Sequence, residues 1–205
     1  STLFPYTTLF RSMTAVQSRG STALLIEGAR RIGKSTIAEK FGRENYRSHI
    51  LIDFAVAPRI IKENFKDNLN DLDRFFQVLS LQYGTRLYPR DSLIIFDEIQ
   101  RFPRAREAIK YLVADGRYDF LETGSLISIR ESVEGIVVPS EERKLKMYPL
   151  TFPEFLMATD EEPLLDYIRQ CYEKRQPLQD AFHKRASYRS EEHTSELQSH
   201  DCISY

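Results

Sequence analysis

The sequence has little cysteine, no long hydrophobic run and almost no net charge, and each shortage excludes a class of protein. Only Cys171 and Cys202 are present among 205 residues, which excludes a disulfide framework and makes a reducing cytoplasm the expected compartment. No apolar run approaches the roughly 18 residues that a membrane span needs. No stretch has the layout of a signal peptide. The formal net charge of −1 gives no overall attraction to nucleic acid or to an anionic membrane.

The remaining composition is that of a globular protein, with 41% hydrophobic and 29% charged residues. A chain of this length suits one domain, or one domain and part of another.

The two ends of the chain differ in character from the rest. Residues 1–12 and 189–205 back-translate into the two ends of a short-read sequencing adapter pair, in the expected order. We therefore expect both tails to be adapter-derived rather than native, and the genuine gene fragment to cover about 13–188 and to continue beyond Tyr188. Such segments are left out of reasoning about the fold.

A glycine-rich stretch at 28–35, G-A-R-R-I-G-K-S, fits the phosphate-binding loop pattern G-x-x-x-x-G-K-[ST] of P-loop NTPases. A short apolar run at 22–27 precedes it and is typical of a buried parallel strand. Residues 36–41 follow with helical spacing and no helix breaker before Gly42. Strand, glycine loop and helix form the context that this motif requires.

The chemistry of phosphate binding explains these residue types. Gly28 and Gly33 let the backbone curl so that successive N–H groups point into one concavity. The following helix presents its unpaired N–H groups and positive dipole end to the same phosphates. Lys34 can reach the β- and γ-phosphates, and the hydroxyl of Ser35 can ligate Mg²⁺.

A second motif lies about sixty residues later, in S-L-I-I-F-D-E at 92–98. An apolar strand that runs into two carboxylates is the Walker B pattern, and a strand of this kind belongs in a parallel sheet covered on both faces. Ligands bind at the carboxyl edge of such sheets. Asp97 is therefore the expected Mg²⁺ residue, and Glu98 is placed to orient and polarise the attacking water.

A third polar strand end occurs at 117–125, which closes with E-T-G-S. In P-loop ATPases with a strand inserted between the two Walker strands, the tip of that strand meets the γ-phosphate and the lytic water. Thr123 is the candidate sensor of the γ-phosphate, and Ser125 is the second candidate. A simple Thr-Gly-Ser turn explains the sequence equally well.

Periodicity and breakers predict the other elements of the chain. One predicted helix, at 71–81, has Leu72, Phe75, Phe76 and Leu79 on one face and Asp71 as its N-cap. The remaining predictions are a helix at 13–19, a strand at 49–54, a helical turn or two at 60–65, a helix at 103–114, a strand at 144–150, and helices starting at 152 and spanning 164–174.

Together these residues resemble the AAA_14 family of bacterial and archaeal AAA-like ATPases, whose ATPase domain usually precedes a DUF4143 domain. The resemblance runs from about Met13 to Ala158. It rests on the Walker motifs G-A-R-R-I-G-K-S at 28–35 and F-D-E-I-Q at 96–100, which many NTPases share. It also rests on three more family-specific segments, which are E-T-G-S-L-I-S-I at 122–129, P-S-E-E at 139–142 and K-M-Y-P-L-T-F-P-E-F-L at 146–156.

The resemblance implies an α/β fold of the ASCE or AAA-like P-loop NTPase type, a three-layer sandwich with about five parallel strands in the order 5-1-4-3-2. It implies an ATPase domain at 13–158, followed at 159–188 by the start of a truncated helical C-terminal region. It further implies Mg²⁺ at Ser35 and Asp97, and Glu98 as the catalytic base, with Lys34 and Thr123 completing the catalytic set. The residues expected to bind ATP are Gly28, Ala29, Arg30, Arg31, Ile32, Gly33, Lys34, Ser35 and Thr36.

The sequence leaves more than one role open for the arginines in and near the predicted site. Arg30 and Arg31 either add charge near the phosphates or point outward as a solvated face. Arg130 and Arg143 are candidate arginine fingers, or a neighbouring subunit supplies the finger.

The predicted activity is Mg²⁺-dependent ATP hydrolysis coupled to a missing C-terminal domain. ATP is favoured over GTP because no N-K-x-D or T-K-x-D motif occurs. The alternative is an ATP-gated interaction switch with little turnover. A small-molecule kinase is disfavoured because paired Asp97 and Glu98 suit water activation. A homo-oligomer or a partner subunit is compatible with the sequence, no membrane partner is expected, and scattered basic residues give no support for nucleic-acid binding.

Overall fold

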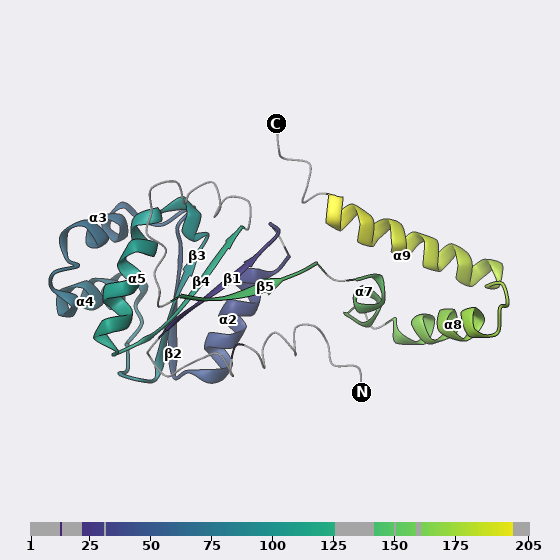
Figure 1. Ribbon diagram of the computed structural model, residues 1–205, viewed down its shortest axis with the longest axis horizontal. Helices are drawn as coiled ribbons and strands as arrows, with labels where there is room; N and C mark the ends of the chain where they lie inside the picture. The colour runs from purple at the N-terminus through teal and green to yellow at the C-terminus, as the bar shows by residue number, and fades with distance from the viewer. Residues whose placement is uncertain are drawn as a thin grey trace. The chain divides into compact units, whose positions relative to one another are not determined.

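The computed structural model describes Met13 and residues 22–30, 32–125, 142–149, 151–158 and 161–198. These residues fall into two units, one that ends at Met147 and one that begins at Tyr148. The larger unit contains a parallel sheet with helices on both faces (Figure 1). None of the described helices is both long and apolar enough to cross a membrane.

The sheet has five strands in the order β2-β3-β4-β1-β5, and every neighbouring pair is parallel. This is the predicted order 5-1-4-3-2 read from the opposite edge, so the predicted α/β fold is confirmed. The strands are β1 (Ala23–Gly28), β2 (Ser48–Asp53), β3 (Ser92–Asp97), β4 (Asp119–Ser125) and β5 (Glu142–Met147).

The helices of the larger unit cover the two faces of the sheet unequally. They are α2 (Lys34–Asn45), α3 (Arg59–Asp67), α4 (Leu72–Tyr83), the short 3₁₀ helix η1 (Ile99–Arg101) and α5 (Pro103–Asp115). Helix α2 packs an aliphatic core against one face. Helices α3, α4 and α5 pack an aromatic-rich core against the other, with Phe65 in edge-to-face contact with Phe54, Phe75 and Phe96. Alternate residues of the central strands enter the two cores, as the period of a strand requires.

The ends of the helices follow the local sequence. Asp71 caps α4, because its carboxylate accepts the N–H of Arg74 at 3.1 Å, as predicted. Gly84 and Gly116 end α4 and α5 with φ of 59° and 74°, values that favour glycine. Helix α2 continues through Gly42 to Asn45. A Cβ at Gly42 would lie 3.0 Å from the Cβ of His49 in β2, so the glycine lets the helix approach this strand closely.

Strand β5 begins two residues earlier than the predicted strand at 144–150 and ends at Met147. The reason lies in the first residue of the strand, Glu142, whose fully buried carboxylate binds Arg106 of α5. The guanidinium donates two hydrogen bonds of 2.9 Å to the two carboxylate oxygens. This ion pair joins the edge strand to the helix layer.

A second carboxyl group, that of Glu122 in β4, lies in the same buried cluster. Glu122 is completely buried, and neither of its oxygens accepts a hydrogen bond from any N–H or O–H of the described residues. Burial raises the pKa of this carboxyl well above its ordinary range, the carboxylate of Glu142 raises the pKa further, and Arg106 opposes both effects. Burial and the neighbouring carboxylate thus both favour the neutral form of Glu122, which can donate its proton toward Glu142.

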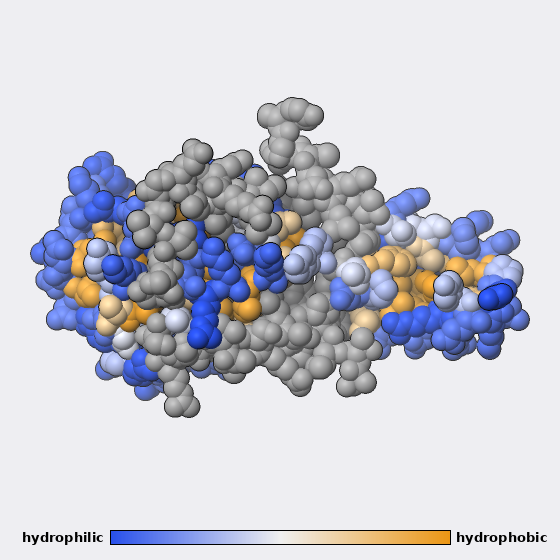
Figure 2. Space-filling model, viewed as in Figure 1, coloured by the Kyte–Doolittle hydropathy of each residue, from blue (hydrophilic) through white to orange (hydrophobic). Residues whose placement is uncertain are grey.

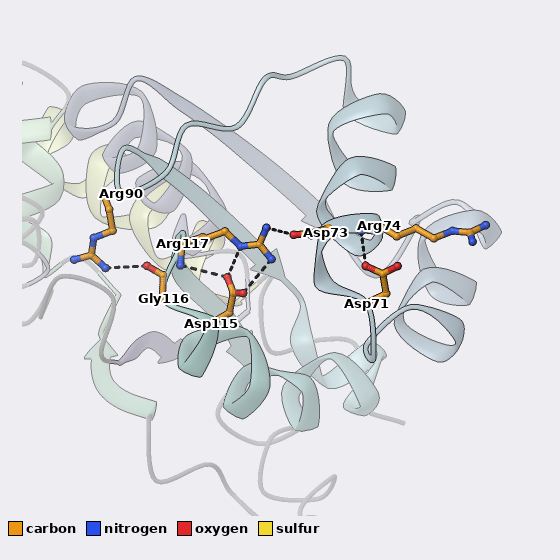
Figure 3. A network of polar contacts seen from close by, with 7 residues as sticks. All are labelled: Asp71, Asp73, Arg74, Arg90, Asp115, Gly116 and Arg117. Carbon is orange, nitrogen blue, oxygen red and sulfur yellow. Dashed lines mark hydrogen bonds and ion pairs between the residues drawn. The ribbon is translucent and has the colours of Figure 1, made fainter.

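A surface network at the amino-terminal end of β4 joins α4 to the end of α5 (Figure 3). The guanidinium of Arg117 donates to Asp115 at 2.7 Å and to Asp73 of α4 at 2.5 Å. Arg90 donates to the carbonyl oxygen of Gly116 at 3.0 Å. These contacts connect segments at the amino-terminal ends of the strands. The phosphate loop lies at the opposite, carboxyl ends of the strands.

The smaller unit is helical, with α7 (Phe152–Ala158), α8 (Glu162–Glu173) and α9 (Asp180–Gln198). Its core is small and consists of Phe155, Leu156, Leu164 and Leu165. Buried Glu161 accepts hydrogen bonds from Arg185 and Arg189 of α9. Hydrophobic residues reach the surface along this unit, whereas polar residues cover most of the visible described surface of the larger unit (Figure 2).

Candidate functional site

The phosphate loop connects β1 to α2 and is shaped by its two glycines. A Cβ on Gly28 would lie 2.3 Å from the carbonyl oxygen of Met147 and 2.8 Å from the side chain of Ile32, so only glycine fits. Gly33 has φ of 87° and immediately precedes α2. The N-cap residue Gly33 offers no side chain to the N–H groups in the first turn of α2, which suits these groups to bind an anion.

Lys34 is the first residue of α2, and its side chain is folded into the loop. It is only 4% exposed, and its ammonium donates to the carbonyl oxygens of Ala29 at 2.5 Å and Gly28 at 3.3 Å. Burial lowers the pKa of Lys34, although the carboxylates of Glu98 and Asp97 oppose that shift. The predicted lysine and the two predicted acidic residues thus share one electrostatic environment.

Asp97, at the carboxyl end of β3, is the point where three elements meet. Its Oδ1 accepts a hydrogen bond of 2.7 Å from the hydroxyl of Ser35 in α2 and another from the hydroxyl of Thr123 in β4. A serine hydroxyl beside a carboxylate supplies the hard oxygen ligands that Mg²⁺ prefers. Within the described ranges no cluster of three or more His, Cys, Asp or Glu forms a complete metal cage.

Glu98 follows Asp97 in an unusual backbone conformation, with φ of 54° and ψ of 46°. Non-glycine residues seldom adopt these left-handed angles. The N–H of Glu98 donates to the hydroxyl of Thr123 at 3.3 Å, and its carboxylate accepts the side-chain amide of Gln100 at 2.5 Å. The backbone and the side chain of Glu98 are therefore each held by a specific partner.

Thr123 is completely buried, and its hydroxyl is hydrogen-bonded to the turn at Asp97 and Glu98. It donates to Asp97 and accepts from the N–H of Glu98, so the structure brings Thr123 together with both acidic residues. Ser125 is buried at the end of the same strand, paired in register with Gly28. A role of Thr123 as a sensor of γ-phosphate stays a prediction.

The other predicted loop residues differ in exposure. Ala29, Arg30 and Thr36 are exposed, whereas the side chain of Ile32 is buried in the core beneath α2. Arg143 is exposed on β5. The remaining two arginines of interest, Arg31 and Arg130, lie outside the described residues.

Two residues of this site were not predicted from the sequence. Met147 supplies the carbonyl oxygen that excludes a side chain at Gly28, and Gln100 contacts Glu98. Gln100 belongs to the F-D-E-I-Q motif, so its position two residues after Glu98 was the available signal.

Comparison with protein-family models gives a match to AAA_14, described as an AAA domain, over residues 20–156. The chain belongs to the AAA_14 family. The matched residues include β1 to β5, the phosphate loop and both acidic residues of the β3 turn. This AAA_14 chain therefore contains a nucleotide-binding domain of the ATPase type. The search of the curated proteins gave no match.

One solved structure with a TM-score above 0.5 shows the same fold at low sequence identity. The ORC1 protein of Aeropyrum pernix, solved in complex with DNA, is 16% identical with a TM-score of 0.52, over 78% of this chain and 50% of that one. Drosophila ORC bound to AT-rich DNA and Cdc6 gives 13% identity and a TM-score of 0.44, over 92% and 81% of the two chains. C. elegans PCH-2 gives 11% identity and a TM-score of 0.37, over 86% of this chain and 47% of that one. The AAA_14 chain spans about half the length of the Aeropyrum protein.

Proposed function

We propose that this domain binds ATP with Mg²⁺ and hydrolyses it. The observation that carries the proposal is the convergence on one oxygen of Asp97, where the hydroxyl of Ser35 and that of Thr123 both donate. This brings the phosphate-loop helix, the Walker B strand and the intervening strand to one point. Family membership supports nucleotide binding.

The residues of the chain have separable roles in the proposed reaction. The N–H groups of the loop and of the first turn of α2 bind phosphate oxygens. Lys34, whose ammonium donates to two loop carbonyls, gains a charged acceptor in phosphate. Ser35 and Asp97 are the residues that would hold Mg²⁺, which when bound neutralises charge on the phosphates. Glu98 orients and polarises the attacking water.

The test of nucleotide binding is a thermal shift of the full chain with Mg-ATP. At a hundredfold excess over Kd, a ligand that binds only the folded state adds about 2.7 kcal/mol. For a chain of this size that raises Tm by about 5–11 °C. Lys34→Ala should abolish the rise, and the exposed Lys66→Ala of α3 is the matched control. A cooperative melt without any response to Mg-ATP would refute a self-sufficient site.

Turnover distinguishes hydrolysis from the alternative of an ATP-gated switch. If Glu98 activates water, Glu98→Gln retains the thermal shift and loses phosphate release by at least about a hundredfold. If the domain is a switch with little turnover, the same substitution changes phosphate release very little.

We further propose that hydrolysis serves a longer protein. The ATPase domain would occupy 13–158, 159–188 would begin a helical C-terminal region, and 1–12 and 189–205 would be adapter-derived. Independent sequencing of the source DNA tests this, because native DNA that encodes both tails would contradict it.

A further inference from the structure

We propose that Gln100 is a positioning residue that holds the carboxylate of Glu98 in its working orientation, an inference that rests on the proposed hydrolysis. The amide nitrogen Nε2 of Gln100 donates to Oε2 of Glu98 at 2.5 Å. Among the described residues, Gln100 is the hydrogen-bond partner of the Glu98 side chain. It leaves the second carboxylate oxygen, Oε1, available to a water molecule.

The backbone around Glu98 makes such a restraint effective. Glu98 has φ of 54°, and its N–H is bonded to the hydroxyl of Thr123, which also donates to Asp97. The main chain is therefore fixed relative to the residue that would hold Mg²⁺. The backbone contacts do not restrict rotation about the side-chain bonds of Glu98. The hydrogen bond from Gln100 to the carboxylate restricts that rotation.

The environment of Gln100 supports a role for its amide beyond packing. Its Oε1 is buried, and no donor among the described residues reaches it. Leaving a buried carbonyl oxygen without a donor costs free energy. An apolar side chain of the same length would avoid that cost, so the feature that distinguishes glutamine here is the N–H group directed at Glu98.

The neutrality of the amide also suits the task. A lysine or arginine at position 100 would pair with Glu98 and cancel the charge that polarises water, whereas an amide orients the carboxylate without neutralising it. A cation whose pKa responds to the charge of both Glu98 and Asp97 is instead Lys34, in the phosphate loop. The η1 turn places residue 100 within reach of residue 98.

The test compares kcat and KM for ATP of the full chain and of Gln100→Met, which keeps length and volume but removes the donor. We expect kcat to fall by about tenfold or more, with KM and the Mg-ATP thermal shift unchanged, because misplacing a reacting group affects the chemical step. Gln82→Met, an exposed residue of α4, is the control. Gln100→Asn, which keeps the amide but shortens its reach, should also lose kcat and serves if Gln100→Met does not fold.

A double-variant cycle separates positioning from general support of the fold. In a Glu98→Gln background, Gln100→Met should lower kcat no further, since the group that it positions is already gone. Equal kcat of Gln100→Met and the parent chain, a higher kcat, or additive losses in the double variant would each overturn the inference while hydrolysis stands. Absence of turnover above the Lys34→Ala background in the parent chain would instead refute the proposed function, and this inference with it.

Discussion

Replacing Glu122 by glutamine should make the stability of the larger unit less dependent on pH. Glu122 is completely buried beside the ion pair of Arg106 and Glu142, and no donor of the described residues reaches its oxygens. Two other charged groups act on this cluster. Lys144 lowers the pKa of Glu122, and Glu27 raises the pKa of Arg106. Glutamine keeps the shape of the protonated carboxyl and cannot ionise.

The sign follows from the direction of the pKa shift. The pKa of Glu122 in the folded state is raised above its unfolded value of about 4.3. The stability that this pKa difference contributes is fully present below the unfolded pKa and is lost as the pH rises through the folded pKa. One proton corresponds to at most about 1.4 kcal/mol per pH unit. Between pH 5.5 and 7.5, Glu122→Gln should therefore gain stability relative to the parent chain as the pH rises, with an upper limit of about 3 kcal/mol, which corresponds to about 6–12 °C in Tm.

The assay is urea unfolding of the full chain at pH 5.5, 6.5 and 7.5. The exposed Glu107→Gln on α5 is the control and should follow the parent chain at each pH. A difference between Glu122→Gln and the parent that is the same at all three pH values would refute a raised pKa of Glu122 in the folded state.

Three further substitutions test the packing and the site. Phe65→Ala removes a fully buried ring from the aromatic core and should cost about 3–5 kcal/mol, measured as a lower urea midpoint. Gly28→Ala forces a Cβ against the carbonyl oxygen of Met147 and should abolish the thermal shift with Mg-ATP. Ser35→Ala removes the hydroxyl bonded to Asp97, and a magnesium titration of ATP turnover should show at least a tenfold higher requirement for the ion.

Much of the larger unit could be predicted because its signals are local. The glycine spacing of the phosphate loop and the apolar runs of β1 and β3 identify their elements from a few neighbouring residues. Gly42 is the first helix breaker after the phosphate loop in the sequence, yet it lies within α2. Its presence within α2 depends on close approach to His49 in β2, a contact that no local pattern reveals.

The candidate site divides in the same way. Lys34, Ser35 and Asp97 were predicted by motif, and the structure brings them together. The contact between Gln100 and Glu98 depends on the left-handed turn at Glu98, which a sequence pattern rich in acidic and apolar residues does not signal. The buried partner of Glu122 could not be predicted either, because it comes from a strand twenty residues later.

The pairing of Gly28 with Met147 has a mechanical consequence. These residues are in register at the ends of adjacent strands, so close that a single methyl group would not fit between them. Met147 is also the last residue of the larger unit, and the next peptide bond leads into the smaller one. The first residue of the proposed phosphate loop and the last residue of the larger unit are thus in direct contact. A backbone shift at Gly28 toward β5 would therefore have to displace Met147 as well.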